Sequence, residues 1–114
     1  METVPLALLA HARSGDKGNH ANLAVVAWTP AGYEHLRRHL TANRVAEFFA
    51  ALGPRQVVRY EVPKLLALNF LLRDVLGGGA SRSLRVDSQG KLLGPAVLEL
   101  QLPAPSDPSA MVRR

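Results

Sequence analysis

A polar stretch between two apolar runs is the feature that most limits how this chain can fold. The stretch is ARSGDKGNHAN (residues 12–22), and it separates VPLALLAHA (4–12) from NLAVVAW (22–28). Both runs lack the polar alternation of a half-exposed strand, so they predict central strands covered on both faces. The polar stretch then predicts a structured loop of about eleven residues, longer than an ordinary hairpin connection.

Two later segments do alternate apolar and polar residues, which predicts strands with one exposed face, nearer an edge. They are RQVVRYEV (55–62) and AVLELQL (96–102). Between them, SLRVDSQGKLLG (83–94) predicts a hairpin, because residues 87–90 are of turn-forming types.

Two helices are predicted between the early and late strands. The dipeptide TP at 29–30 is typical of an N-cap and first helical position, and it predicts a helix that runs to residue 40. A second apolar stripe within residues 45–52 predicts another helix, which is capped by Thr41 or Asn43 and stopped by the following Gly-Pro pair.

A third helix is predicted over residues 65–76, after Pro63, because leucines recur there at helical spacing. Its apolar residues cover more than one face, whereas an amphipathic helix needs only one apolar stripe. This width predicts a homo-oligomer, most simply a dimer. Asn69 lies among the apolar residues, and a buried amide needs a hydrogen-bond partner, so we expect it to bond to loop backbone.

The order of strand, strand, helix pair, strand, helix and hairpin favours an α+β sandwich, with helices on one face of a mainly antiparallel sheet. With 114 residues the chain has the length of one domain. We expect this domain to span residues 1–103. Residues 104–114 are rich in proline and small polar types and predict a disordered tail.

Composition limits the chemistry. The chain has no cysteine, which excludes disulfides and thiolate metal sites. No apolar run approaches the roughly 18 residues of a membrane span, so we expect a cytosolic protein without membrane contact. The net charge of +5 suits an acidic small molecule, an acidic partner or nucleic acid, since net charge governs association and not fold.

The polar stretch is a candidate anion site. Arg13 and Lys17 supply positive charge, while Gly15 and Gly18 permit positive φ and a close approach of the backbone to a ligand. The glycine spacing fits neither a P-loop nor a dinucleotide fingerprint. Self-capping is the alternative, in which short polar side chains bond to their own turns. The residues concerned would be Asp16, Asn19 and Asn22.

The second unusual stretch is LGGGASRSLR (76–85). Gly77 suits a helix C-cap, but three consecutive glycines indicate a place where backbone approaches something closely. Arg82 could hold a phosphate or carboxylate by a bidentate contact. The alternative is a surface ion pair of Arg82 with Asp74 or Glu99.

These stretches carry a resemblance to a known family. HARSGDKGNHANLAVVAW (11–28), YEVPKLLALNFLL (60–72) and LGGGASRSLRVDSQGKLLG (76–94), in that order, resemble the small C-terminal domain of the acyclic terpene utilisation protein A (AtuA) family. The resemblance extends from Leu6 to Leu102. It implies a ferredoxin-like fold and a link to bacterial breakdown of branched terpenoids through acyl-CoA intermediates. In longer relatives a large domain precedes this one, which implies a large domain encoded separately as a partner.

The resemblance joins the two stretches into one predicted ligand site. Lys17 and Arg82 would hold negative groups, and Asp16 would orient Lys17. No cofactor and no metal is assigned to this site. The candidate residues are Arg13, Ser14, Gly15, Asp16, Lys17, Gly18, Asn19, Asn69, Gly78, Gly79 and Arg82.

Three classes of function follow. The leading one is a small accessory or ligand-binding subunit of an AtuA-type system, acting with the large domain on acyl-CoA or other acidic metabolites. The second is a stand-alone enzyme with Asp16 or a histidine as acid or base, for which His11, Asp16 and His20 form only a weak metal constellation. The third is an RNA-binding domain, which the aromatic content of 5% disfavours.

Overall fold

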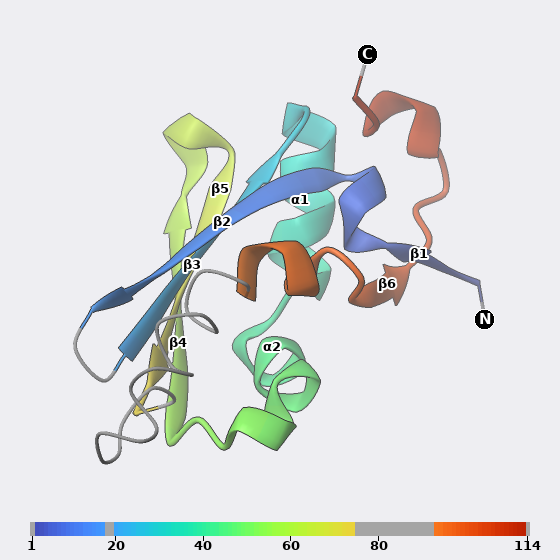
Figure 1. The fold of residues 1–114 in the computed structure, drawn as a ribbon. Coiled ribbons are helices and arrows are strands. Elements are labelled where there is room, and N and C mark those ends of the chain that lie inside the picture. The colour runs from blue at the N-terminus through green and yellow to red at the C-terminus, as the bar shows by residue number, and fades with distance from the viewer. Residues whose placement is uncertain (1, 18–19, 75–92, 114) are drawn as a thin grey trace.

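The computed structural model describes residues 2–17, 20–74 and 93–113 and combines strands with helices (Figure 1). The strands are β1 (Thr3–Pro5), β2 (Ala10–Lys17), β3 (His20–Ala27), β4 (Gln56–Val62), β5 (Ala67–Arg73) and β6 (Gln101–Pro103). The α-helices are α1 (Pro30–His39) and α2 (Ala42–Phe48), and the short 3-10 turns are η1 (Leu6–Leu8), η2 (Ala50–Leu52), η3 (Pro63–Leu65) and η4 (Pro108–Ala110).

Four strands form one antiparallel sheet in the order β2-β3-β5-β4. Helix α1 packs on β3 and β5, helix α2 packs on β4, and both helices lie on the same side of the sheet (Figure 1). Strands β1 and β6 pair in a separate small sheet. The predicted α+β class, with a mainly antiparallel sheet and helices on one face, is therefore confirmed.

Local capping chemistry defines the two helices as predicted. The hydroxyl of Thr29 accepts a hydrogen bond from the backbone N–H of Gly32 at 3.0 Å, and Pro30 opens α1. The hydroxyl of Thr41 accepts from the N–H of Arg44 at 3.1 Å and caps α2. Thr41, rather than Asn43, is thus the cap of the second helix.

The prediction of a helix over residues 65–76 is wrong, because residues 67–73 form β5 at the centre of the sheet. The turn η3 and a left-handed Leu66, with φ of 56°, reverse the chain so that Val62 pairs with Ala67. Leucines at helical spacing also fit the alternation of a strand, and here the backbone of β5 is hydrogen-bonded to β3 on one side and β4 on the other. The segment therefore does not form a helix with two apolar faces, on which the predicted dimer depended.

Both ends of the domain also differ from expectation. The first apolar run divides into β1, η1 and the edge strand β2, so it is not one central strand. Most of the strand predicted over 96–102 is absent, because residues 93–97 are helical and only β6 is extended. The predicted hairpin over 83–94 falls mainly on residues 83–92, which lie outside the described residues.

The two faces of the sheet have different surroundings. In β3 every second residue is buried against the helices, while the residues between them are half-buried or exposed on the opposite face. No described element covers that opposite face, which we call the open face, so the described residues do not show the predicted cover on both faces of these strands. The core includes Leu6, Leu9, Leu23, Val25, Leu36, Leu40, Val45, Leu68, Phe70, Leu72, Val97 and Leu102.

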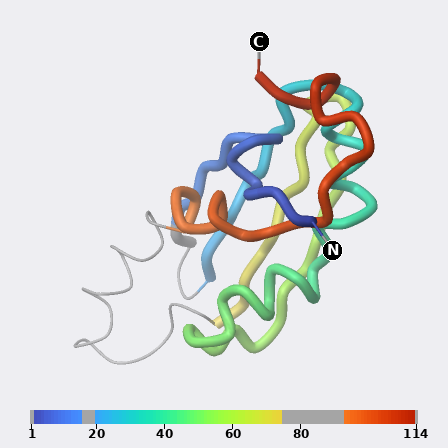
Figure 2. Tube along the Cα trace, turned by 90° about the vertical axis from the view of Figure 1, so that its right-hand side faces the viewer, coloured from blue at the N-terminus to red at the C-terminus, as the bar shows by residue number. Residues whose placement is uncertain are grey.

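Residues 104–113 pack along α1 and its N-terminus instead of extending freely, as Figure 2 shows. The hydroxyl of Thr29 donates to the carbonyl of Ala110 at 2.8 Å, and Met111 packs against the core. The guanidinium of Arg113 lies 5.1 Å from the ring centroid of Trp28. This differs from the disordered tail that composition suggested, because these tertiary contacts hold the segment against the domain.

Candidate functional site

The polar stretch of residues 12–22 is a hairpin and not a long loop. Strands β2 and β3 pair from Ala10 opposite Ala27 to Lys17 opposite His20. Only residues 18–19 separate the strands, which is the length of a two-residue hairpin connection. The polar side chains of this stretch are therefore distributed over two faces of a strand pair, because side chains alternate along each strand.

Arg13 and Ser14 illustrate this division. Arg13 is exposed and pairs with Ala24 on the open face. Ser14 lies on the opposite face, where its Oγ accepts a hydrogen bond from the backbone N–H of Gly94 at 2.6 Å. Gly15 lies in the extended strand, where a Cβ added to it would meet no atom within 4 Å, so Gly15 does not adopt the positive φ that glycine permits.

The remaining candidates of the two motifs are described only in part. The backbones of Asp16 and Lys17 pair with Ala21 and His20 at the end of the hairpin. The other candidates lie outside the described residues: Gly18, Asn19, Gly78, Gly79 and Arg82.

Asn69 sits at the middle of β5 on the open face, flanked by Ala24 of β3 and Tyr60 of β4. It is half-buried and makes no hydrogen bond to another described side chain or backbone group through its amide. The prediction that it ties a helix to loop backbone is wrong, because its segment is a strand whose backbone is already paired. Its amide instead lines a hollow of the open face.

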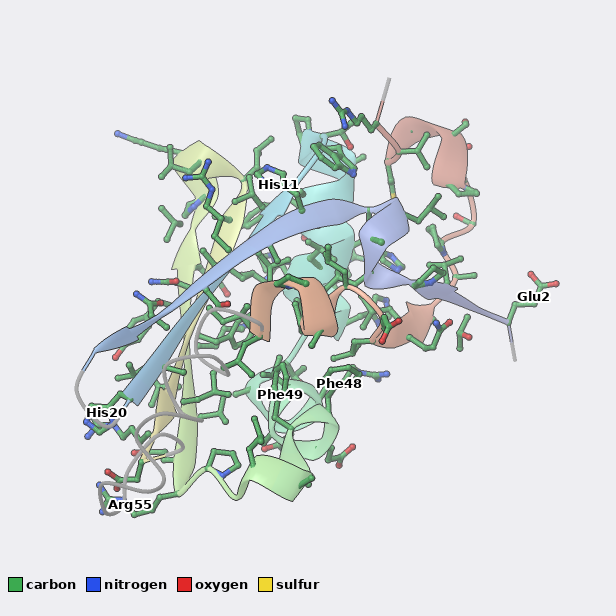
Figure 3. The ribbon with its side chains drawn as sticks, in the orientation of Figure 1. Glu2, His11, His20, Phe48, Phe49 and Arg55 are labelled. Carbon is green, nitrogen blue, oxygen red and sulfur yellow. The ribbon has the colours of Figure 1, made fainter. Side chains whose placement is uncertain are left out.

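A charged cluster joins the hairpin to the end of β5. The backbone N–H of Asp74 donates to Nδ1 of His20 at 3.0 Å, and the carboxylate of Asp74 forms an ion pair with Arg55. Figure 3 shows His20 and Arg55 at the same end of the sheet. Arg73, opposite Gln56, carries a buried Nε that has no hydrogen-bond partner among the described residues. Sequence reasoning missed this cluster because it depends on the pairing of β3 with β5.

The weak metal constellation of His11, Asp16 and His20 is not supported. His11 pairs with Val26 and His20 pairs with Lys17, so the two histidines lie at opposite ends of the hairpin (Figure 3). Eight residues lie between them in the sequence, and their positions at opposite ends of the strand pair prevent them from sharing one ion. Among the described residues no group of three or more histidine, aspartate or glutamate side chains is arranged to hold a metal.

A second hollow, of about 450 Å³, lies between α1 and residues 104–111. Nε2 of His35 donates to the carbonyl of Pro103 at 2.8 Å, and the rings of His35 and His39 lie 4.4 Å apart. Burial lowers the pKa of His39, and the charges of His35, Arg44 and Arg38 lower it further. The i, i+4 spacing in HLRRH indicates two histidines on one face of a helix. The hollow itself could not be predicted, because residues 104–111 form one of its walls and a disordered tail was expected there.

None of the helices in the described part of the chain is both long enough and apolar enough to cross a membrane. The search of curated proteins and the search of solved structures each found no match. The scan of protein families found one: the AtuA ferredoxin-like domain, which matches residues 4–103. This match covers both motifs, the whole four-stranded sheet and the helical layer. The chain therefore belongs to the AtuA ferredoxin-like domain family.

Proposed function

We propose that this protein is a small accessory subunit of an AtuA-type system, which binds acyl-CoA or another acidic metabolite together with a separately encoded large domain. The observation that carries the proposal is that the residues on both sides of the segment 75–92 contact the β2–β3 hairpin, one at its end and one in the middle of β2. Asp74 contacts His20, and Gly94 contacts Ser14. The residues that flank the glycine-rich stretch on both sides thus contact the hairpin that bears the first motif.

The charges at the end of the sheet where His20 contacts Asp74 support an acidic ligand there. Arg73 offers a guanidinium whose Nε has no partner in the described part of the chain, and Lys17 ends β2. Arg55 is neutralised by Asp74, so it does not add a free charge. A guanidinium in a partly buried place binds phosphate or carboxylate more strongly than one in water.

The open face supports a role beside a partner. Half-buried apolar residues of β3, β4 and β5 line it, together with Tyr60, which is 50% exposed. Apart from Tyr60 it presents no tyrosine, phenylalanine or tryptophan from the described part of these three strands. RNA-binding sheets of this class stack bases on several aromatic rings, so nucleic acid remains disfavoured in the proposal.

Calorimetric titration tests the proposal. A CoA thioester is titrated into wild type and Lys17→Ala, each alone and with the large domain. We expect binding heat from wild type with the large domain, and a loss of about tenfold in affinity for Lys17→Ala, because one charge-assisted contact contributes roughly 1.5 kcal/mol. Arg113→Ala removes the same charge from the far end of the molecule and serves as the matched control.

Equal heats from wild type and Lys17→Ala in both conditions would contradict the proposed site. Turnover of the thioester by the isolated chain would replace the accessory role by a catalytic one. Salt-sensitive binding of RNA by wild type, with no response to the thioester, would contradict both the accessory and the catalytic role and support an RNA-binding domain. A cytosolic location belongs to the same proposal.

We also propose that the chain forms a homo-oligomer, with a dimer as the simplest form. Exposed apolar surface supports the homo-oligomer, because the side chains of Phe48 and Leu65 are 39% and 67% exposed. Light scattering at micromolar concentration should give at least twice the mass of the chain. A monomer mass would contradict the proposal.

A further inference from the structure

The open face contains a hollow of about 510 Å³ between β3, β5 and the turn that joins β4 to β5. We propose that this hollow binds the aliphatic chain of a small molecule and that the neighbouring amides of Asn22 and Asn69 bind a carbonyl group of the same molecule. The inference deepens the proposed function and rests on it for the biological ligand. The lining residues are Asn22, Ala24, Val26, Val62, Leu65, Ala67 and Asn69.

One end of the hollow is apolar. Val26, Ala67 and Val62 pair in a row across the three strands β3, β5 and β4. Leu65, in the turn η3, adds a leucine side chain that is 67% exposed. An aliphatic chain laid on this row would remove apolar surface from water on both partners, which is favourable in proportion to the area buried.

The other end is formed by the two amides. Ala24 lies opposite Asn69, and Asn22 is two residues before Ala24 on the same strand, so Asn22 and Asn69 are diagonal neighbours about 7–8 Å apart. Neither amide side chain is hydrogen-bonded to another described residue. A carbonyl oxygen seated between them could accept an N–H from each, because it has two lone pairs.

A small molecule fits this place better than a peptide strand. The backbones of β3 and β5 are hydrogen-bonded to neighbouring strands on both sides, so a peptide laid over the hollow could not extend the sheet. Amides inside a hollow with an apolar wall are the arrangement of a small-ligand pocket, in which a few polar groups set the orientation.

The geometry also connects the hollow to the charged end of the sheet. Arg73 lies six positions beyond Ala67 on β5, which corresponds to about 20 Å at the rise of an antiparallel strand. Asn69 lies between them. A ligand with its chain on the apolar row and its anionic group near Arg73 would therefore be elongated, with a carbonyl part of the way along it.

Uncharged probes test the hollow independently of the anion site. Butanamide, pentanamide and hexanamide are titrated into isotope-labelled wild type and followed by amide chemical shifts. We expect shift changes centred on Ala24, Val26 and Asn69, and affinity that rises with each methylene by up to about fourfold. Because the series uses wild type alone, its result does not depend on any variant folding.

Two variants sharpen the test. Val26→Thr keeps the shape of the side chain but replaces one methyl group of the apolar row by a hydroxyl, so it should reduce the gain in affinity per methylene. Asn69→Leu should remove the preference for hexanamide over hexanol. Val4→Thr makes the same change as Val26→Thr in β1, outside the four-stranded sheet, and should leave the series unchanged.

Three results would overturn the inference: no shift changes up to the solubility limit of hexanamide, shift changes centred elsewhere, or affinity that does not depend on chain length. A dimer that Leu65→Ser dissociates, with no binding of the amides, would assign the hollow to a protein interface. If hexanamide binds but Lys17→Ala leaves the response to a CoA thioester unchanged, the proposed anion site fails and the hollow stands.

Discussion

The backbone N–H of Gly94 donates a hydrogen bond to Oγ of Ser14 at 2.6 Å, although 80 positions separate the two residues. This contact brings the helical turn of residues 93–97 directly against the backbone of β2. A Cβ built on Gly94 would lie 3.2 Å from the backbone nitrogen of Ser14 and 3.3 Å from the carbonyl oxygen of Ala12. The first motif is therefore packed against the residues that follow the glycine-rich stretch.

The first prediction follows from this close approach. Gly94→Ala should lower the free energy of unfolding by about 1–3 kcal/mol, because the atoms that its methyl group meets are backbone atoms of β2 and cannot move aside easily. Urea denaturation measures the change. Gly15→Ala is the matched control: space is open at Gly15, so alanine there should leave stability equal or raise it by up to about 1 kcal/mol. Equal losses for both variants would contradict the packing described.

The second prediction concerns the tail. Deletion of residues 104–114 should lower the melting temperature by about 5 °C or more, because it removes the contact of Met111 with the core and the hydrogen bond from Thr29 to Ala110. Differential scanning calorimetry measures the shift. Deletion of residues 113–114 is the control and should have a smaller effect. A melting temperature unchanged by the longer deletion would instead support the disordered tail that composition predicts.

The third prediction concerns a hydroxyl in the core. The Oη atom of Tyr33 is buried without a hydrogen-bond partner in the described residues, and burial, followed by the nearby charge of Glu61, raises the pKa of this side chain. Tyr33→Phe should raise the free energy of unfolding by about 1 kcal/mol, because it removes an unsatisfied polar group and keeps the ring. A loss of stability in urea denaturation would show that the hydroxyl has a partner in solution.

The fourth prediction concerns pH. Burial lowers the pKa of His39 below its ordinary value of 6.5, and the neighbouring charges act in the same direction. The unfolded chain therefore binds more protons at this residue than the folded chain as the pH falls through 6.5. The stability due to neutral His39 is present above pH 6.5 and decreases below it, down to the lowered pKa.

Urea denaturation between pH 8 and 5 checks this sign. The unfolding free energy of wild type should fall towards the acid side, and His39→Gln should reduce that fall, because glutamine does not titrate. A steeper fall in His39→Gln than in wild type would contradict the assignment.

The parts of the fold that depend on neighbouring residues could be predicted from the sequence. Thr29 and Thr41 cap their helices through hydrogen bonds to residues three positions further on, so the signal lies within one turn. The strand at RQVVRYEV was predicted by alternation within the segment itself. Family membership could also be predicted, because the motifs occur in order along the chain.

The secondary structure of residues 65–76 could not be predicted from neighbouring residues alone. Leu65, Leu68 and Leu72 fit one face of a helix, yet Leu68 and Leu72 are equally well placed on one face of a strand. The choice depends on whether strands β3 and β4 are available to pair with it, and these lie about 45 and 10 positions earlier in the chain. Non-local hydrogen bonding therefore decided what local periodicity left ambiguous.

For the candidate site too, some features follow from residue type and others from the positions of residues in the fold. Residue type alone indicates where the chain carries charge, amides and flexible backbone. The folded arrangement is needed to place Arg13 and Ser14 on opposite faces of β2, His20 beside Asp74, and Asn69 on the open face. The physical reason is strand pairing: the register of β2, β3 and β5 sets both the face and the neighbours of every side chain, and no window of sequence contains all three strands.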